Sequence, residues 1–363
     1  MDILKHFVVT LFILFTVPFS YANQDKSEKP FDVGELIMHH VKDAHEWHLW
    51  GDEHKGTSIY LPVIIYDNGL KTFSSRYLYH GKEVSSTDKM GNEYHIMMGE
   101  GPANGYALFH EKIYKLNNGI LNIHEGHPTN AKPLDFSITK NVSSLFIGAI
   151  IITLLMLLMA RYYKSNGAVA PKGIAKFIEP LVIVIRDDIA QENIGHGKHH
   201  KYVPYLLTIF FFVWINNLLG LVPIFPGGAN LTGNITITFF LALCTLLITL
   251  FSSNKNYWKH IFATPGVPVA LMPIMIPIEL VGILTKPFAL MIRLFANITA
   301  GHIIILALIS IIFINKNMAW GALSVPMALF ISCLEMLVAV LQAYLFALLS
   351  ALFIGAAVEE AHH

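Results

Sequence analysis

The stretch KPFALMIRLFANITAGHIIIL, from Lys286 to Leu306, decides how the rest of this sequence is interpreted. It is almost entirely apolar, yet Arg293 stands in its middle, and a guanidinium group keeps its charge at any ordinary pH. Charges inside an apolar membrane helix are costly and rare, and they usually mark ion pathways or proton relays. The stretch therefore predicts a membrane helix with a charge that serves a function.

Composition indicates that most of the chain lies in a membrane. Of its 363 residues, 54% are hydrophobic and only 14% are charged, whereas soluble domains carry about 25% charged residues. The net charge is zero, which gives no indication of nucleic acid as a partner. Cys244 and Cys333 lie in apolar runs without metal-ligand spacing, so we expect them to pack rather than to form a disulfide framework or a metal site.

Residues 1–22 have the pattern of a secretory signal peptide. Lys5 and His6 precede a short apolar run, and small residues near Ala22 fit a cleavage site. An uncleaved first membrane helix is the alternative. With either interpretation, the residues that follow begin outside the cytoplasm.

Residues 23–140 are predicted to form a small extracytoplasmic domain that contains strands. This segment holds ten of the eighteen histidines, and its β-favouring runs include IYLPVIIY (59–66) and GYALFHEKIYKL (105–116). Turn clusters such as DNG and HGK separate the runs.

A histidine cluster lies in HHVKDAHEWHLW (39–50), which contains His39, His40, His45 and His48. The spacings of His40 and His45 from His48 are compatible with one helical face, so a metal site is one interpretation. A hydrated or buffering surface is the interpretation we favour, and we expect no metal and no cofactor.

Five apolar segments are predicted to span the membrane, because a span needs ~20 apolar residues. They cover residues 142–160, 202–225, 232–251, 271–314 and 319–358. Basic residues follow the first and third of these segments and mark the cytoplasmic side: Arg161, Lys164, Lys172, Lys176, Arg186, Lys255 and Lys259. Residues 172–192 mix charges with apolar residues and are predicted to lie along the membrane surface.

The last two apolar segments are too long for an upright span. At ~1.5 Å per residue, 45 residues reach ~65 Å, about twice a ~30 Å bilayer core. One interpretation is that Pro273, Pro277, Pro287 and Pro326 break these helices. The other is a steeply tilted hairpin with a long exposed flank.

Polar residues in these two segments fall on defined faces. With ~100° per residue, Glu279, Lys286 and Asn297 fall within ~40° of Arg293, whereas His302 points to the opposite face. Glu335 and Gln342 are seven residues apart and share a face of the last helix. Structural ion pairs are the simpler interpretation, but this many polar groups on two helices favour an ion pathway.

Taken in order, these motifs resemble subunit a of F-type ATP synthases. The resemblance rests on KPFALMIRLFANITAGH together with YVPYLLTIFFFVWINNLLGLVP (202–223), IPIELVGILTKP (276–287) and LEMLVAVLQAYLFALLS (334–350). It covers residues 141–363. It implies an outer helix, a surface helix, a spanning hairpin and a long tilted hairpin against a rotor ring.

The resemblance also implies roles for individual residues. Arg293 matches the essential arginine that faces the ring carboxylates, Asn297 the asparagine one turn later, and Gln342 the glutamine of the last helix. His302 and Glu335 match a coupled acid–histidine pair, in exchanged order. Asn217 matches an asparagine ahead of the Leu-Val-Pro end of the first hairpin helix, Glu279 an acidic position, and Phe353 a position where tyrosine is common, so it receives no polar role.

The fold expected is thus an all-α polytopic membrane protein of about five spanning helices, plus a surface helix and the small N-terminal domain. The function implied is that of the stator subunit that forms two proton half-channels against the rotor c-ring. Subunit b, the other ATP synthase subunits and the lipid bilayer are the further partners implied. The location implied is the bacterial inner membrane, and we expect the N-terminus to be periplasmic and the C-terminus cytoplasmic.

The chain contains no G-x-x-x-x-G-K-[ST] loop, so it is not expected to process nucleotides by itself. A self-contained ion channel or secondary transporter with a metal-binding outer domain is the alternative function. Inverted repeats would favour that alternative, and the sequence contains none that we recognise. Proton or sodium as the coupling ion stays open, although His302 beside Glu335 favours protons.

Overall fold

The computed structural model describes residue 34, residues 42–50, 57–87, 93–124, 126–167, 169–222, 225–262, residue 268, and residues 271–315 and 317–359. These residues belong to one unit, Val33–His363. The signal-peptide interpretation of residues 1–22 lies outside the described residues, as do His39 and His40.

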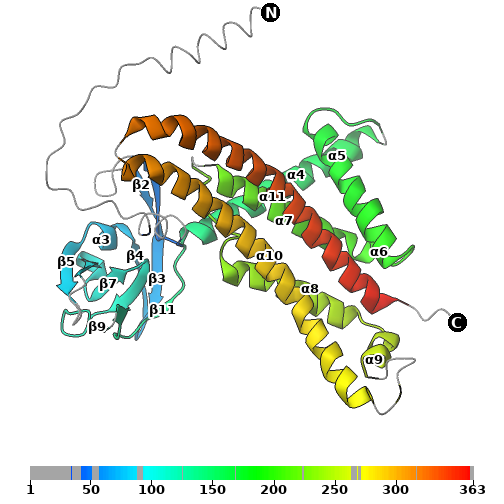
Figure 1. The fold of residues 1–363 in the computed structure, drawn as a ribbon, viewed down its shortest axis with the longest axis horizontal. Coiled ribbons are helices and arrows are strands. Elements are labelled where there is room, and N and C mark those ends of the chain that lie inside the picture. The colour runs from blue at the N-terminus through cyan, green and yellow to red at the C-terminus, as the bar shows by residue number, and fades with distance from the viewer. Residues whose placement is uncertain are drawn as a thin grey trace, which may run out of the picture. The chain divides into compact units, whose positions relative to one another are not determined.

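The N-terminal part of the structure is built from short antiparallel strands (Figure 1). Strand β1 (Glu46–Trp50) pairs with β2 (Thr57–Tyr60). The other strands are β3 (Pro62–Tyr66), β4 (Leu70–Ser74), β5 (Lys82–Thr87), β6 (Glu93–Met98), β7 (Tyr106–Phe109), β8 (Lys112–Lys115), β9 (Ile123–His124), β10 (His127–Pro128) and β11 (Leu134–Asp135). They form a three-stranded sheet in the order β11-β3-β4, a four-stranded sheet in the order β5-β6-β7-β8, and the pair β10-β9. A short helix, α3 (Arg76–Tyr79), follows β4.

The two β-favouring runs form strands as the sequence predicts. Residues 59–66 contribute to β2 and β3, and residues 105–116 form the hairpin of β7 and β8. Asn68 and Gly69, in the DNG cluster, both have positive φ and close the turn between β3 and β4. Val63 and Ile65 alternate into the core of this region, where neither has any exposed surface.

The helical interpretation of the histidine cluster was wrong. Residues 46–50 form strand β1, so His45 and His48 do not share a helical face. His45 is buried and contacts Asp135, with 3.3 Å between Nε2 and Oδ2, while the exposed His48 contacts Ser58. The residues around His48 form a strand because β1 pairs with β2, and this pairing outweighs the helical spacing of the histidines.

Among the residues that the structure describes, five helices are long and apolar enough to cross a membrane. They are α4 (Lys140–Asn166), α7 (Val203–Leu221), α8 (Ile235–Ser252), α10 (Met272–Ile314) and α11 (Gly321–Val358, or Met318–Val358 with the 3₁₀ turn before it). Between α4 and α7 lie α5 (Ile174–Ile183), a π-helical segment η2 (Val184–Gln191), α6 (Glu192–Ile194) and a 3₁₀ turn (His199–Lys201). Helix α9 (Lys255–Phe262) connects α8 to the start of α10. The structure is thus that of a polytopic membrane protein with a strand-containing N-terminal region.

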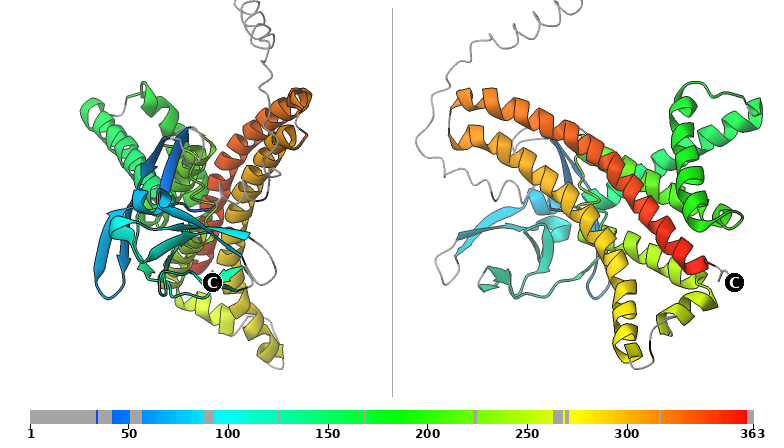
Figure 2. Two further views of the ribbon diagram at one scale, coloured as in Figure 1. Left: turned by 90° about the vertical axis from the view of Figure 1, so that its left-hand side faces the viewer. Right: turned by 45° about the vertical axis from the view of Figure 1, so that its right-hand side comes forward.

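Helices α10 and α11 run antiparallel and side by side (Figures 1 and 2). They contain 43 and 38 residues, and Pro277, Pro287 and Pro326 lie inside them without ending them. The interpretation that prolines break these segments is therefore excluded. At ~1.5 Å per residue the two helices reach ~65 Å and ~57 Å, so an upright span of a ~30 Å core is also excluded.

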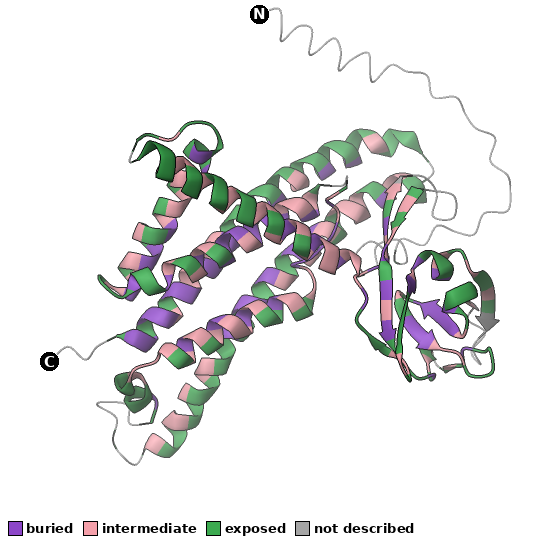
Figure 3. Cartoon of the chain, turned by 180° about the vertical axis from the view of Figure 1, so that it is seen from behind, coloured by how far each residue is buried: buried purple, intermediate pink, exposed green. Residues whose placement is uncertain are grey.

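The core of the helical part forms around α7. Buried side chains from η2, α7, α10 and α11 meet there, and Leu206, Phe211 and Ile354 are completely enclosed. Figure 3 shows the buried residues gathered on the inner sides of these helices and exposed residues along the outer sides of α10 and α11. The apolar exposed sides are what a lipid-facing or partner-facing helix requires.

The strand region is joined to the first long helix by hydrogen bonds at the start of α4. The Asp43 carboxylate accepts a hydrogen bond from the backbone amide of Asn141 at 3.0 Å and another from the Thr139 hydroxyl at 2.8 Å. The Lys140 amide donates to the carbonyl of Ala44 at 2.9 Å. These bonds satisfy donors that an isolated helix N-terminus leaves unpaired.

Replacing Asp43 tests this joint. Asp43→Ala removes both acceptors, and we expect the free energy of unfolding to fall by about 1–2 kcal/mol. Asp43→Asn keeps one acceptor oxygen and should cost less. Thermal unfolding of the purified full chain, followed by the amide hydrogen exchange of residues 140–144, measures the effect.

The pH dependence of the Asp43→Asn variant gives a second measurement. Burial raises the pKa of Asp43 in spite of its hydrogen bonds. The wild-type chain therefore gains stability as the pH falls from above this raised pKa towards the ordinary value of 3.8. The Asn variant has no such titration, and equal pH profiles would contradict the assignment.

Candidate functional site

Arg293 and Asn297 lie on the exposed side of α10. Both residues are exposed, one helical turn apart, and the small residues Ala296 and Ala300 on the same side are exposed as well. Leu294 and Ile298 point to the buried side of the same helix. The predicted stripe is therefore an outward-facing feature of the helix.

Within the described ranges, the ion pairs join other residues, and none links Arg293 to Glu279 or Glu335. The interhelical ion pairs that the sequence left as the simpler interpretation are not formed in this chain. A fixed positive charge thus stands on an apolar, exposed helix side, flanked by small side chains.

Lys286 and Glu279 occupy the part of α10 that precedes Arg293. Lys286 is exposed, and its Nζ lies 5.7 Å from the ring centroid of Phe353 on α11. Phe353, to which the sequence assigned no polar role, therefore forms a cation–π contact. Lys286 and Phe353 also share a small cleft with Tyr257 of α9.

Glu279 is half-buried and lies close to α9. Burial raises the pKa of Tyr257, and the negative charge of Glu279 adds to the effect. Glu279 is 14 positions before Arg293, which corresponds to ~21 Å along the helix. It is thus remote from His302, which lies on the other side of Arg293 along α10.

Glu335 is buried where α10 and α11 come closest. Its side chain is 9% exposed, and its Oε2 atom has no hydrogen-bond partner in the part of the chain that the structure describes. The carboxyl group packs directly on Gly301, where a Cβ atom would overlap Oε1. Gly301 therefore provides the space that the Glu335 carboxyl occupies.

His302 turns away from this contact towards α7. Its Nδ1 atom lies 3.1 Å from the carbonyl oxygen of Ile298, and the ring also hydrogen-bonds the backbone of Gly220 on α7. His302 and Glu335 are therefore brought to the same level of the helix pair, because Glu335 packs on the residue before His302. No hydrogen bond joins the two side chains within the described residues.

Asn217 and Gln342 are buried among the helices. Asn217 on α7 is 2% exposed, and its Oδ1 atom accepts a bond of 2.5 Å from the Thr232 hydroxyl. Its Nδ2 atom has no partner among the described residues. Gln342 is 4% exposed and lies on the same buried side of α11 as Glu335, as the sequence predicts.

The polar residues thus divide into two sets. Asn217, Glu335 and Gln342 are buried and His302 is half-buried, whereas Arg293 and Asn297 face outwards. Unpartnered donor and acceptor atoms in the buried set can bind water or exchange protons.

Sequence reasoning missed Thr232, Gly220 and Gly301. Thr232 holds Asn217, the backbone of Gly220 binds His302, and Gly301 admits Glu335. For Gly301 a signal existed, because a glycine inside an apolar helix marks a close approach of another group.

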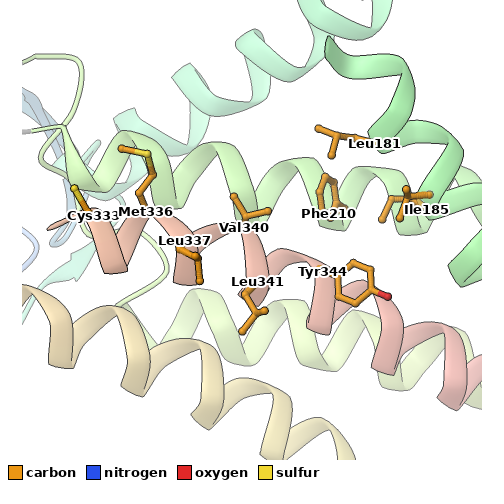
Figure 4. Close-up of a pocket in the computed structure, with 10 residues that line it drawn as sticks. Leu181, Ile185, Phe210, Cys333, Met336, Leu337, Val340, Leu341 and Tyr344 are labelled. Atoms are coloured by element: carbon orange, nitrogen blue, oxygen red, sulfur yellow. The ribbon is translucent and has the colours of Figure 1, made fainter. Parts of the chain in front are cut away.

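An apolar groove lies apart from these residues (Figure 4). It has a volume of about 670 Å³, and the residues around it come from α5, η2, α7 and α11. Its lining is Leu181, Val184, Ile185, Phe210, Cys333, Met336, Leu337, Val340, Leu341 and Tyr344. Because this lining contains no acid, base or histidine, the groove does not contribute to the polar site. Cys333, expected to pack, is exposed at its edge.

The fold and the site define a class: a polytopic membrane protein with two overlong, paired helices that carry ionisable residues. The family model of the ATP synthase A chain matches residues 142–355, more than half of the sequence. The chain therefore belongs to the family of ATP synthase subunit a, a non-catalytic subunit of the membrane sector. A second family model, described as a domain of unknown function, matches residues 36–136.

Named relatives agree with this assignment. The chain is 47% identical to ATP synthase subunit a of Chloroherpeton thalassium over 235 residues, which cover 63% of this chain and 69% of the relative. It is 50% identical to ATP synthase subunit a 2 of Chlorobaculum tepidum, with 61% and 64% covered. It is 44% identical to ATP synthase subunit a of Myxococcus xanthus, with 63% and 76% covered.

Gly301→Ala tests the contact between α10 and α11. The added Cβ overlaps the Glu335 carboxyl group, so we expect overpacking, a loss of stability of about 1–3 kcal/mol, and impaired proton translocation. Thermal unfolding and ATP-driven acidification of inverted membrane vesicles measure the two effects.

Gly282→Ala on the same helix is the matched control, because a Cβ there meets nothing within 4 Å. It should be neutral or stabilising by about 1 kcal/mol. Equal behaviour of the two variants would contradict the role of the Gly301 contact.

Proposed function

We propose that this chain forms two proton half-channels in the stator of an F-type ATP synthase and couples proton flow to the rotation of a c-ring. The observation that carries this proposal is the exposed Arg293, with the small residues Ala296 and Ala300 on the same outer side of α10. The membership of the chain in the family of ATP synthase subunit a supports the proton-translocating role. The named relatives do not favour the self-contained channel or transporter.

A charge on this helix side requires a partner other than lipid. Exposing an arginine at mid-helix to hydrocarbon costs at least ~2.5–3.5 kcal/mol. Ala296 and Ala300 allow another helix to approach closely, as small residues do at membrane interfaces. A carboxylate on that helix would remove the cost, and the guanidinium would in turn favour the ionised form of the carboxylate.

The outer half-channel is proposed to use the buried polar set. A proton enters past Asn217 and reaches the level of His302, Glu335 and Gln342, where it neutralises a ring carboxylate. The burial of Glu335 and its unpartnered Oε2 atom support a role as a proton carrier.

The exit half-channel is proposed to begin at Arg293. A returning ring carboxylate meets the guanidinium, loses its proton and is held in the charged form. Asn297, one turn away on the same exposed side, can hydrogen-bond that carboxylate. Glu279 and Lys286 lie along the part of α10 that precedes Arg293, where Glu279 can receive the proton on its way to the cytoplasm. One charge moved across 100 mV is worth ~2.3 kcal/mol, so several protons must pass for each ATP.

The proposed topology places the start of α4 outside the cytoplasm and the C-terminus inside, in the bacterial inner membrane. The basic residues between α4 and α7 support this orientation. The α10–α11 hairpin would then lie steeply tilted against the ring, with α5 near the cytoplasmic membrane surface. Subunit b is proposed as a further partner, and the domain boundaries are proposed near residues 23 and 140.

Arg293→Ala is expected to abolish ATP-driven acidification of inverted vesicles, because the ring carboxylate loses the charge that forces its deprotonation. Arg293→Lys should retain little activity, since lysine can lose its proton when it is desolvated. The assay is made with assembly verified and without added sodium, so that it also tests the proton as the coupling ion.

Arg161→Ala provides the charge-matched control, because Arg161 is an exposed residue at the far end of α4. Its acidification should equal that of the wild type. Coupled pumping at the wild-type rate by Arg293→Ala would refute the proposed mechanism.

A further inference from the structure

The segment between α7 and α8 is folded back onto the last turns of α7. The Gly228 amide donates to the carbonyl of Leu219 at 3.1 Å, and the Thr232 hydroxyl donates to Asn217. At Gly227 a Cβ atom would overlap the backbone of α7, so only glycine permits this approach. Residues 225–234, which we call the return segment, therefore determine the surroundings of Asn217.

Trp47, on strand β1 of the N-terminal region, contacts this return segment. Its indole Nε1–H donates a hydrogen bond of 3.1 Å to the carbonyl of Gly227. Its ring packs edge to face against Phe225, with 5.1 Å between the ring centroids and 72° between the planes. Trp47 is only 3% exposed, so its indole ring is enclosed, whereas Phe225 is 46% exposed.

Trp47 is itself held from two directions. Strand β1 pairs with β2, and the carbonyl of His45 accepts a bond from the Leu61 amide. Three residues before Trp47, the carbonyl of Ala44 accepts the Lys140 amide at the start of α4. The indole is therefore fixed relative to α4 before it reaches the return segment.

The return segment connects Trp47 to two residues of the proposed outer half-channel. The Thr232 hydroxyl holds Asn217. The backbone of Gly220 faces His302. Gly220 also packs against the carbonyl of Ala229, because a Cβ atom on Gly220 would lie 3.2 Å from that oxygen. A displacement of the return segment would thus move Thr232, which binds Asn217, and change the packing on Gly220, which faces His302.

We propose that Trp47 is a positioning residue for proton entry, and that the N-terminal region acts through it to hold the outer half-channel in its conducting geometry. This inference rests on the proposed function. Tryptophan suits the role because it combines a large rigid ring with one directed donor. The N-terminal region then controls the geometry of the proton path without lining it.

The test uses assembled complexes in inverted vesicles, where the vesicle lumen bathes the extracytoplasmic side. After removal of the soluble headpiece, passive proton flow is driven by a potassium diffusion potential and is measured per assembled complex at several lumen pH values. Trp47→Phe keeps a ring and removes the N–H donor, whereas Trp47→Ala removes both contacts.

We expect Trp47→Phe to lower the conduction per complex roughly three- to tenfold, as the loss of one buried hydrogen bond predicts, and Trp47→Ala to lower it further. The lumen-pH profile should shift, because the bonding of His302 changes. Hydrogen exchange in residues 225–234 should rise in both variants. Tyr66→Ala, at a residue 53% exposed on β3, should behave like the wild type.

A merely structural role would reduce the amount of complex and leave the conduction per complex and its pH profile unchanged, and that result would overturn the proposal. Phe225→Leu removes the ring contact from the side of the return segment and takes over the test if Trp47→Phe does not assemble.

Asn217→Ala, measured in parallel, separates the proposed proton path from the positioning role of Trp47. If Asn217→Ala conducts normally, the path assignment fails. If only the Trp47 variants conduct normally, the positioning role alone fails.

Discussion

The close contact between Gly301 and Glu335 is the constraint on which the polar site depends. A carboxyl group can be buried between two apolar helices only where one of them leaves room, and Gly301 leaves that room on α10. The same contact sets the register of the helix pair. It brings Glu335 next to the residue before His302, whereas Arg293, eight positions before Gly301, is exposed ~80° away around the helix and ~12 Å away along it. The buried position of the Glu335 carboxyl group is thus a consequence of the side chain that Gly301 lacks.

The separation of the two sites also has an electrostatic meaning. Arg293 keeps its charge in every environment, so a direct contact with Glu335 would hold that carboxylate in the charged form. Within the described residues no ion pair joins the two groups, so Arg293 does not hold the Glu335 carboxyl group in the charged form. The two ionisable groups can therefore do different chemistry.

Much of this arrangement could be predicted from the sequence. The helical period assigned Arg293, Asn297 and His302 to their sides, and the length of the apolar segments indicated the long hairpin. Pattern alone could not decide whether Pro287 ends a helix, because packing against α8 and α11 determines whether a proline is tolerated. It also could not find the bond between Thr232 and Asn217, which joins residues on two sides of a turn. The helical interpretation of His45 and His48 failed for the same reason, since the pairing of β1 with β2 is a long-range interaction.

Pro277 and Pro287 give α10 an uneven stiffness. A proline nitrogen donates no hydrogen bond, so two rungs of the backbone ladder are missing, and both fall before Arg293. After Arg293 the described helix contains no proline up to Ile314. The half of α10 that bears Glu279 and Lys286 is therefore the compliant half, and the half that bears Gly301 and His302 is the rigid one. A force applied at Arg293 would therefore deform mainly the compliant side, and the contact that buries Glu335 would keep its shape.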